Sequence, residues 1–189
     1  LAHVPFVSVQ NMMKLVHSIG LETAMEQIAS YIEADFLRWE AFDKTPRVAS
    51  HSDVGVIELM PTSDGELYGF KYVNGHPANM AKGLQTVTAF GLLAKVSSGY
   101  PVLLSEMTLL TALRTAAMSA LAAKWLGPEN PDTMAVIGNG AQAEFQSLAF
   151  ARICGIGTVR LWDVDPAATE KCVRNLEGSG LTVVSCTSA

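Results

Sequence analysis

The chain has 189 residues, of which 49% are hydrophobic and 16% charged. This composition excludes general disorder and allows one large domain or two small ones. The formal net charge is -5, and no segment concentrates lysine and arginine, which argues against a nucleic-acid-binding surface. We therefore expect small molecules or proteins as partners.

The cysteine pattern indicates a reducing compartment, and the hydropathy pattern argues against a membrane span. The three cysteines are an odd number without C-x-x-C spacing, which favours neither a disulfide framework nor a metal site and fits a reducing cytoplasm. The apolar stretch from Leu109 to Leu126 contains Arg114 and several hydroxyl groups, so we expect no membrane span. The chain begins with leucine, which suggests that it is not a whole translation product.

The first part of the chain predicts two helices followed by strands. Apolar residues between Val9 and Phe42 recur at helical spacing, and Gly20 separates two amphipathic helices. From Arg47 onward, short runs rich in Val, Ile, Tyr and Phe alternate with turn residues and predict a mostly antiparallel sheet. These runs are "RVASHSDVGVIELMP", "ELYGFKYVNG" and "YPVLLSE". The stretch from Thr86 to Leu93 is compatible with a helix, and the pattern leaves its type open.

The remaining elements alternate regularly. Residues Thr108 to Leu126 predict a long alanine-rich helix that Gly127 and Pro128 end, and we place a domain boundary there, with domains 1–128 and 129–189. The pattern after it predicts a parallel sheet with right-handed crossovers. The order is strand Thr133 to Ile137, helix Ala141 to Cys154, strand Val159 to Asp163, helix Pro166 to Leu176 and strand Leu181 to Cys186. We therefore predict an α/β protein, with an α+β domain followed by the first half of a Rossmann domain.

A glycine turn joins the first two of these elements in "TMAVIGNGAQAEFQSLAF". Gly138 allows the tight turn, Gly140 lets a phosphate approach the backbone, and Ala143 lets the helix lie close to the strand. The amides of Ala141 and Gln142 lie at the positive end of that helix, where an anion is stabilised. A glycine turn can also have a purely steric role.

Asp163 makes this turn a candidate NAD site. It ends the next predicted strand about twenty residues beyond Ala143, where a carboxylate can accept hydrogen bonds from ribose hydroxyls. A carboxylate there also repels a 2'-phosphate, so NAD is favoured over NADP. Asp165 lies directly before Pro166 and is interpreted as a helix N-cap instead.

Several charged residues interrupt apolar surroundings. Arg114 lies in a helix that is small or apolar on nearly every face, so its guanidinium should meet an anion, and an internal ion pair, a side chain reaching water and a ligand contact all remain open. Arg47, Glu58 and Lys71 lie in the predicted strands, and each taken alone is typical of a solvated strand face. Together they suggest a site with cations for a carboxylate and one carboxylate for an amine or a proton transfer. The histidine spacing indicates neither a metal site nor a nucleophile triad.

The chain resembles a known family over nearly its whole length. The segments "RVASHSDVGVIELMP", "FKYVNGHPANMAKGLQTVTAFGLL", "SGYPVLLSEMTLLTALRTAAMSALAA" and "MAVIGNGAQAEFQSLAF" are similar to the ornithine cyclodeaminase/mu-crystallin family, and within it to bacterial ornithine cyclodeaminases. The resemblance implies a homodimer whose first domain, 1–128, binds substrate and dimerises. It also implies NAD-dependent conversion of L-ornithine to L-proline and ammonia through internal hydride transfer and a cyclic imine.

The resemblance also implies roles for individual residues. Arg47 and Lys71 would bind the substrate carboxylate, Arg114 would contact that region and the cofactor, and Glu58 and Met60 would line the substrate pocket. The residues implied at the cofactor are Thr86, Arg114, Gly138, Gly140, Ala141, Gln142 and Asp163.

The resemblance stops short at the C-terminus. The aspartate that the family uses near the side-chain amine lies beyond residue 189, so no catalytic residue is assigned here, although Glu58 is a candidate. The first strand of the Rossmann half, central in a complete sheet, becomes an open edge. We therefore expect a fragment that lacks turnover. Other expectations remain open: a ketimine reductase or amino-acid dehydrogenase of the same family, or a non-catalytic ligand-binding protein of mu-crystallin type.

Overall fold

The structure is a computed structural model that describes residues 3–189. The chain divides into two compact units, which are described separately here. Unit 1 comprises the residues up to Ser18 together with Asp35–Thr111, and unit 2 comprises Ile19–Ala34 together with Ala112–Ala189. This division groups the helix before Gly127 with the second sheet. The domain boundary at residue 128 stays a prediction.

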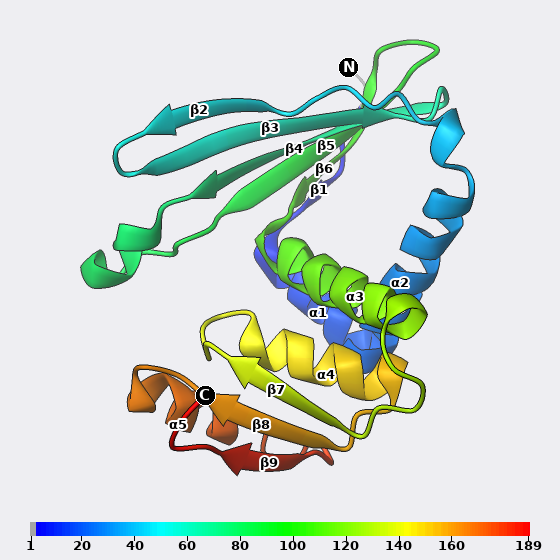
Figure 1. Cartoon of the computed structure of the whole chain (residues 1–189). Helices are drawn as coiled ribbons and strands as arrows, with labels where there is room; N and C mark the ends of the chain where they lie inside the picture. Colours follow the sequence, from blue (N-terminus) through cyan, green and yellow to red (C-terminus); the bar gives the residue numbers. More distant parts are fainter. Residues whose placement is uncertain (1–2) are drawn as a thin grey trace. The chain divides into compact units, whose positions relative to one another are not determined.

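Unit 1 is built around one six-stranded sheet with the order β1-β6-β5-β4-β3-β2 (Figure 1). Neighbouring strands run antiparallel except β1 and β6, which are parallel, so the prediction of a mostly antiparallel sheet is confirmed. The strands are β1 Phe6–Val7, β2 Val48–Ser52, β3 Gly55–Ser63, β4 Leu67–Gly75, β5 Ala89–Lys95 and β6 Pro101–Glu106. The helical elements are α1 Val9–Ile19 and the 3-10 helices η1 Trp39–Ala41 and η2 Pro77–Lys82.

Two details of unit 1 refine the sequence interpretation. The run that begins at Arg47 is a hairpin rather than one strand, because residues 53–54 form a turn between β2 and β3. The ambiguous stretch from Thr86 to Leu93 is not helical. It leads into β5, whose residues pair with β4 on one side and β6 on the other.

Unit 2 contains a three-stranded parallel sheet with the order β7-β8-β9. Its strands are β7 Thr133–Ile137, β8 Thr158–Trp162 and β9 Thr182–Ser185, and its helices are α3 Thr108–Leu126 from Ala112 onward, α4 Ala143–Cys154, α5 Pro166–Asn175 and most of α2 Leu21–Leu37. The predicted alternation is confirmed, and β7 is an edge strand of this sheet, as expected. The helix α4 begins two residues later than predicted.

Apolar packing holds the elements of unit 2 together. Val159 and Leu161 on β8 are fully buried in a cluster with residues of α4 and α5. Residues of α2, α3 and α4 form a second cluster, which includes Ala29, Ala117 and Leu121. Because burial of apolar surface is the main stabilising contribution, these clusters fix α4 against the sheet and α5 on one side and against α2 and α3 on the other.

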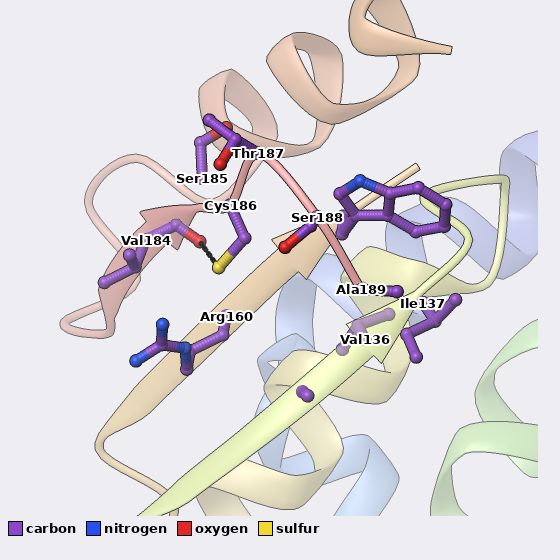
Figure 2. A pocket seen from close by; sticks show the side chains of 11 residues that line it. Val136, Ile137, Arg160, Val184, Ser185, Cys186, Thr187, Ser188 and Ala189 are labelled. Carbon is purple, nitrogen blue, oxygen red and sulfur yellow. Dashed lines mark hydrogen bonds between the residues drawn. The ribbon is translucent and has the colours of Figure 1, made fainter. Parts of the chain in front are cut away.

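The other face of this sheet is bare. Ala135, Arg160 and Val184 are opposite one another in register and line a hollow of about 450 Å³ on it (Figure 2). Parallel sheets are normally covered on both faces, so the hollow lies on a face of the kind that other elements usually cover. Among the described residues, no helix is both long and apolar enough to cross a membrane.

Candidate functional site

The glycine turn of unit 2 has the backbone that a phosphate needs. Gly138 has a φ of +91°, a left-handed conformation that favours glycine, and its N–H donates to the carbonyl of Trp162 at 2.8 Å. A Cβ atom placed on Gly140 would meet no other atom within 4 Å, so this side of the turn is open. Ala143 is 3% exposed in the core cluster, so its small side chain lets α4 approach the sheet, as predicted.

The carboxylate of Asp163 lies against this turn. Its Oδ2 accepts the backbone N–H of Asn139 at 2.5 Å, and its Oδ1 accepts the N–H of Asp165 at 2.9 Å. Hydrogen bonds from the backbone of Asp165 and Asn139 hold the pKa of Asp163 below its usual range. The structure therefore brings together the two features that the sequence predicts for a dinucleotide site. Asp165 also caps α5, because its Oδ1 accepts the N–H of Ala167, which confirms the N-cap interpretation.

Sequence reasoning missed Asn139, which lies between the two glycines. Its side chain is completely buried, and its Oδ1 accepts the hydroxyl of Thr169 on α5 at 2.7 Å. Its Nδ2 donates to the carbonyl of Val136 at 3.3 Å. The sequence contains only a weak signal for this bond. Thr169 precedes Cys172 and Leu176 at helical spacing, so its hydroxyl faces the core from an otherwise apolar stripe.

The residues around the turn fit a dinucleotide. The first N–H groups of an α-helix have no partner within the helix. At the start of α4 the N–H of Ala143 donates to the carbonyl of Gly140 at 3.1 Å, so the N–H groups of the turn before it, on Ala141 and Gln142, are the candidates for a pyrophosphate. The acidic residue in its first turn is Glu144, whose carboxylate pairs with Lys171 at 3.2 Å and accepts a hydrogen bond from Asn175 at 2.8 Å. That charge is therefore compensated by α5. The donors at the turn and the acceptor at Asp163 match a pyrophosphate and a ribose.

Four other predicted residues gather on one face of the sheet in unit 1. Residues directly opposite in a sheet share a face, and the register pairs Met60 with Lys71, and Glu58 two residues away with Val73. Arg47 joins them, because its Nη1 lies 3.2 Å from Oε1 of Glu58. The side chain of Arg47 is 61% exposed and that of Glu58 is 20% exposed, while Lys71 is half-buried.

This face carries opposite charges that already pair with each other. Arg47 was predicted to bind a carboxylate and Glu58 an amine or a proton. In the structure the two side chains form an ion pair, so each occupies the place that a ligand group of the same charge would take. A zwitterion, which has one carboxylate and at least one ammonium group, matches such a pair.

The loop that contains Thr86 is held by two asparagines that sequence reasoning did not single out. Asn74 accepts the backbone N–H of Thr88 at 2.7 Å, and the carbonyl of Thr86 accepts the N–H of His76 at 2.9 Å. The Nδ2 of Asn79 donates to the carbonyl of Gln85 at 2.9 Å. Thr86 is thus fixed at the end of β4, within unit 1.

Arg114 corrects one step of the sequence interpretation. The argument for an anionic partner assumed burial in an apolar helix, but Arg114 is exposed. The buried face of α3 is the stripe Leu113, Ala116, Ala117, Ala120 and Leu121. The small residues next to Arg114 form that stripe, and the guanidinium lies outside it, so no desolvation cost demands a ligand. Among residues 3–189, no group of three His, Cys, Asp or Glu side chains could hold a metal ion.

These features define a class of protein. The chain combines a charged face on a mostly antiparallel sheet with the strand, turn and helix of a dinucleotide-binding half-domain. A family model described as the ornithine cyclodeaminase/mu-crystallin family matches residues 9–189. The chain belongs to this family, as the sequence motifs indicate.

Known relatives agree with this assignment. The ornithine cyclodeaminase of Brucella suis biovar 1 (strain 1330) is 68% identical over 185 residues, which are 98% of this chain and 52% of the relative. The chain thus spans about half the length of the curated relatives it matches.

Solved structures confirm the fold class. A lysine cyclodeaminase studied for its recognition of L-lysine, L-ornithine and L-2,4-diaminobutyric acid has a TM-score of 0.91 at 28% identity, covering 98% of this chain and 56% of the other. An archaeal alanine dehydrogenase dimer with bound NAD has a TM-score of 0.83 at 30% identity, covering 97% of this chain and 56% of the other.

Proposed function

We propose that this chain is the substrate-binding and first cofactor-binding part of an enzyme that converts L-ornithine to L-proline and ammonia with NAD. The observation that carries the proposal is the gathering of Arg47, Glu58, Met60 and Lys71 on one face of the sheet in unit 1. The 68% identity to an ornithine cyclodeaminase supports this choice of reaction.

The side chains of this face have complementary roles in the proposal. Arg47 and Lys71 bind the substrate carboxylate. Glu58 receives an ammonium group, and Met60 packs against the carbon chain of the substrate. Holding the carboxylate and an ammonium group of the substrate restricts its rotation and positions the carbon that carries the 2-amino group, which lowers the barrier of the later steps.

The cofactor part of the proposal rests on unit 2. The turn from Gly138 through Gly140 and the amides of Ala141 and Gln142 hold the pyrophosphate, and Asp163 accepts the ribose hydroxyls. NAD would supply a reversible hydride acceptor when bound, and the residues of this chain would orient it. The bound NAD of the archaeal alanine dehydrogenase supports this choice of cofactor.

Binding measurements with variants test the substrate face. Arg47→Ala and Lys71→Ala should each weaken L-ornithine binding by roughly ten- to a hundredfold, because each removes a charge-assisted hydrogen bond to the carboxylate. Calorimetric titration of the full-length protein measures this, with Lys95→Ala on the same sheet as a matched charge control. Unchanged ornithine affinity in both site variants would refute the assignment.

Activity assays test the reaction itself. The full-length protein should form proline from ornithine with no net production of NADH, whereas the 189-residue chain should form none, because the acid implied near the side-chain amine is not among its residues. NAD-dependent proline formation by the 189-residue chain alone would contradict this expectation.

A second candidate reaction is favoured by the similarity to an alanine dehydrogenase. An amino-acid dehydrogenase or ketimine reductase would use the same carboxylate contacts but would change the net amount of NADH. Following NADH absorbance together with proline and ammonia distinguishes these reactions. A non-catalytic binding protein would bind NAD and show none of them.

A homodimer is the partner that the proposal includes. Leu59, Tyr72 and Phe90 lie side by side across β3, β4 and β5, on the face opposite Lys71. Leu59 and Phe90 are 43% exposed, and the rings of Tyr72 and Phe90 stack at 4.9 Å. Exposed apolar area of this kind marks a protein interface. The archaeal relative, whose structure is a dimer, supports the association of two copies.

A further inference from the structure

The peptide between the two glycines of the turn is held from three directions. The Asn139 backbone N–H donates to Asp163 after β8, its amide Nδ2 donates to Val136 on β7, and its amide oxygen accepts the hydroxyl of Thr169 on α5. Asn139 and Thr169 are 0% and 5% exposed, so water does not compete for the bond between their side chains.

This bonding is specific to the turn and is not needed to attach α5. The helix is already fixed by the core cluster around Cys172 and Leu176. Glu144 also joins it to α4 through Lys171 and Asn175. The main effect of the Thr169 hydroxyl is therefore to position Asn139, at the point where the backbone turns toward α4, and not to attach α5.

We propose that Asp163, Asn139 and Thr169 form a lock that sets the glycine turn before the dinucleotide binds, and that Thr169 and Asn139 are positioning residues for NAD. The inference rests on the cofactor part of the proposed function. It adds that a hydroxyl on α5, which bonds to the side chain of Asn139, controls dinucleotide affinity.

The lock also gives Asp163 two simultaneous duties. Each of its oxygens accepts one backbone N–H, and a carboxylate oxygen has a second lone pair that can accept a ribose hydroxyl. An asparagine at this position would place its NH₂ group against the N–H of either Asn139 or Asp165, so that donor faces donor. Removing the charge of Asp163 should therefore loosen the turn, rather than convert an NAD site into an NADP site.

Hydrogen exchange of the turn tests the lock without any cofactor. In the 189-residue chain, Thr169→Val should raise the exchange rate of the Asn139 amide about five- to tenfold, because the buried Asn139 oxygen loses its donor. Thr169→Ser should restore the slow exchange. Ser147→Ala, which removes another buried hydroxyl that bonds only within α4, is the matched control. Unchanged exchange in Thr169→Val would overturn the lock.

Titration with NAD then tests the functional part. Thr169→Val should weaken NAD binding about fivefold at a temperature where both proteins are fully folded, and Thr169→Ser should bind as the wild type does. If the wild-type chain and the full-length protein bind no NAD, the proposed NAD site is refuted. The hydrogen-exchange result still tests whether Thr169 holds Asn139 in place. If Thr169→Val exchanges faster but binds NAD normally, the positioning role is overturned.

Asp163→Asn provides a second variant, because Asp163 is only half-buried and its replacement should not prevent folding. It should raise exchange at Asn139 and weaken the binding of both NAD and NADP. A variant with a protected turn and improved NADP binding would contradict the inference.

Discussion

Replacing Glu58 by glutamine should change ligand preference on the sheet face of unit 1 in two opposite directions. Glu58 and Arg47 form an ion pair at 3.2 Å in the structure. A plain carboxylate that binds Arg47 must separate this pair and leaves Glu58 without a cation. A diamino acid replaces both partners at once, because its carboxylate takes the place of Glu58 and an ammonium group takes the place of Arg47.

The size of each change in ligand binding follows from the solvent exposure of the Arg47 and Glu58 side chains. Because Arg47 is 61% exposed, solvent screens the pair, and its free energy is at most about 1 kcal/mol. Glu58→Gln should therefore improve binding of a plain carboxylate such as pentanoate by no more than roughly fivefold. The same variant removes a charge-assisted hydrogen bond to the ornithine ammonium at a side chain that is 20% exposed, so ornithine should bind roughly ten- to a hundredfold more weakly.

Calorimetric titration of the full-length protein with pentanoate and with L-ornithine measures both effects. Glu66→Gln removes an exposed charge from the turn between β3 and β4 and serves as the control, which should leave both affinities unchanged. The reasoning is refuted if Glu58→Gln weakens the binding of pentanoate and of L-ornithine equally. Glu58 would then not compete with the ligand carboxylate for Arg47.

Three further predictions follow from other residues. Leu59→Asp places a charge on the exposed apolar face and should shift the full-length protein from dimer to monomer in sedimentation velocity, while His51→Asp on β2 should not. Because the folded pKa of Asp163 lies below the ordinary value of 3.8, its contribution to stability is present above that pH and is lost as the pH falls below it. Urea unfolding should therefore show that the stability difference between wild type and Asp163→Ala is constant from pH 7 to pH 5 and narrows below pH 4; a difference that widens in acid would contradict this. Burial raises the pKa of Cys172 to about 11, so this thiol should resist a thiol-specific reagent at pH 8 until the chain is unfolded, and rapid native labelling would contradict the packing of α5.

The regular part of unit 2 could be predicted closely from sequence. The three strands match within one residue at each end, because short apolar runs bounded by glycine, proline and aspartate have few other interpretations. The N-cap at Asp165 was also predictable, since an acidic residue before Pro166 has a local mechanism. The start of α4 was placed too early, because the turn continues through Ala141 and Gln142.

The pairings within the sites could not be predicted in the same way. The Arg47–Glu58 pair depends on the register of β2 and β3, which the turn at residues 53–54 decides. The bond from Thr169 to Asn139 joins residues 30 positions apart, and no local pattern links them. For Arg114 the sequence pattern suggested burial, whereas the structure shows an exposed side chain. A helix rich in alanine can bury one narrow stripe and still expose a cation beside it.

The two candidate site carboxylates differ in what they must give up when a ligand arrives. Asp163 is bonded to backbone N–H groups that stay in place, so in the proposed NAD site ribose hydroxyls would add to its existing bonds with little reorganisation. Glu58 is bonded to an exposed side chain, so an ammonium group has to replace Arg47. The first arrangement favours a tightly held cofactor, because the cost of ordering the turn is met during folding. The second arrangement favours selectivity, because only a ligand with both charges compensates both members of the pair.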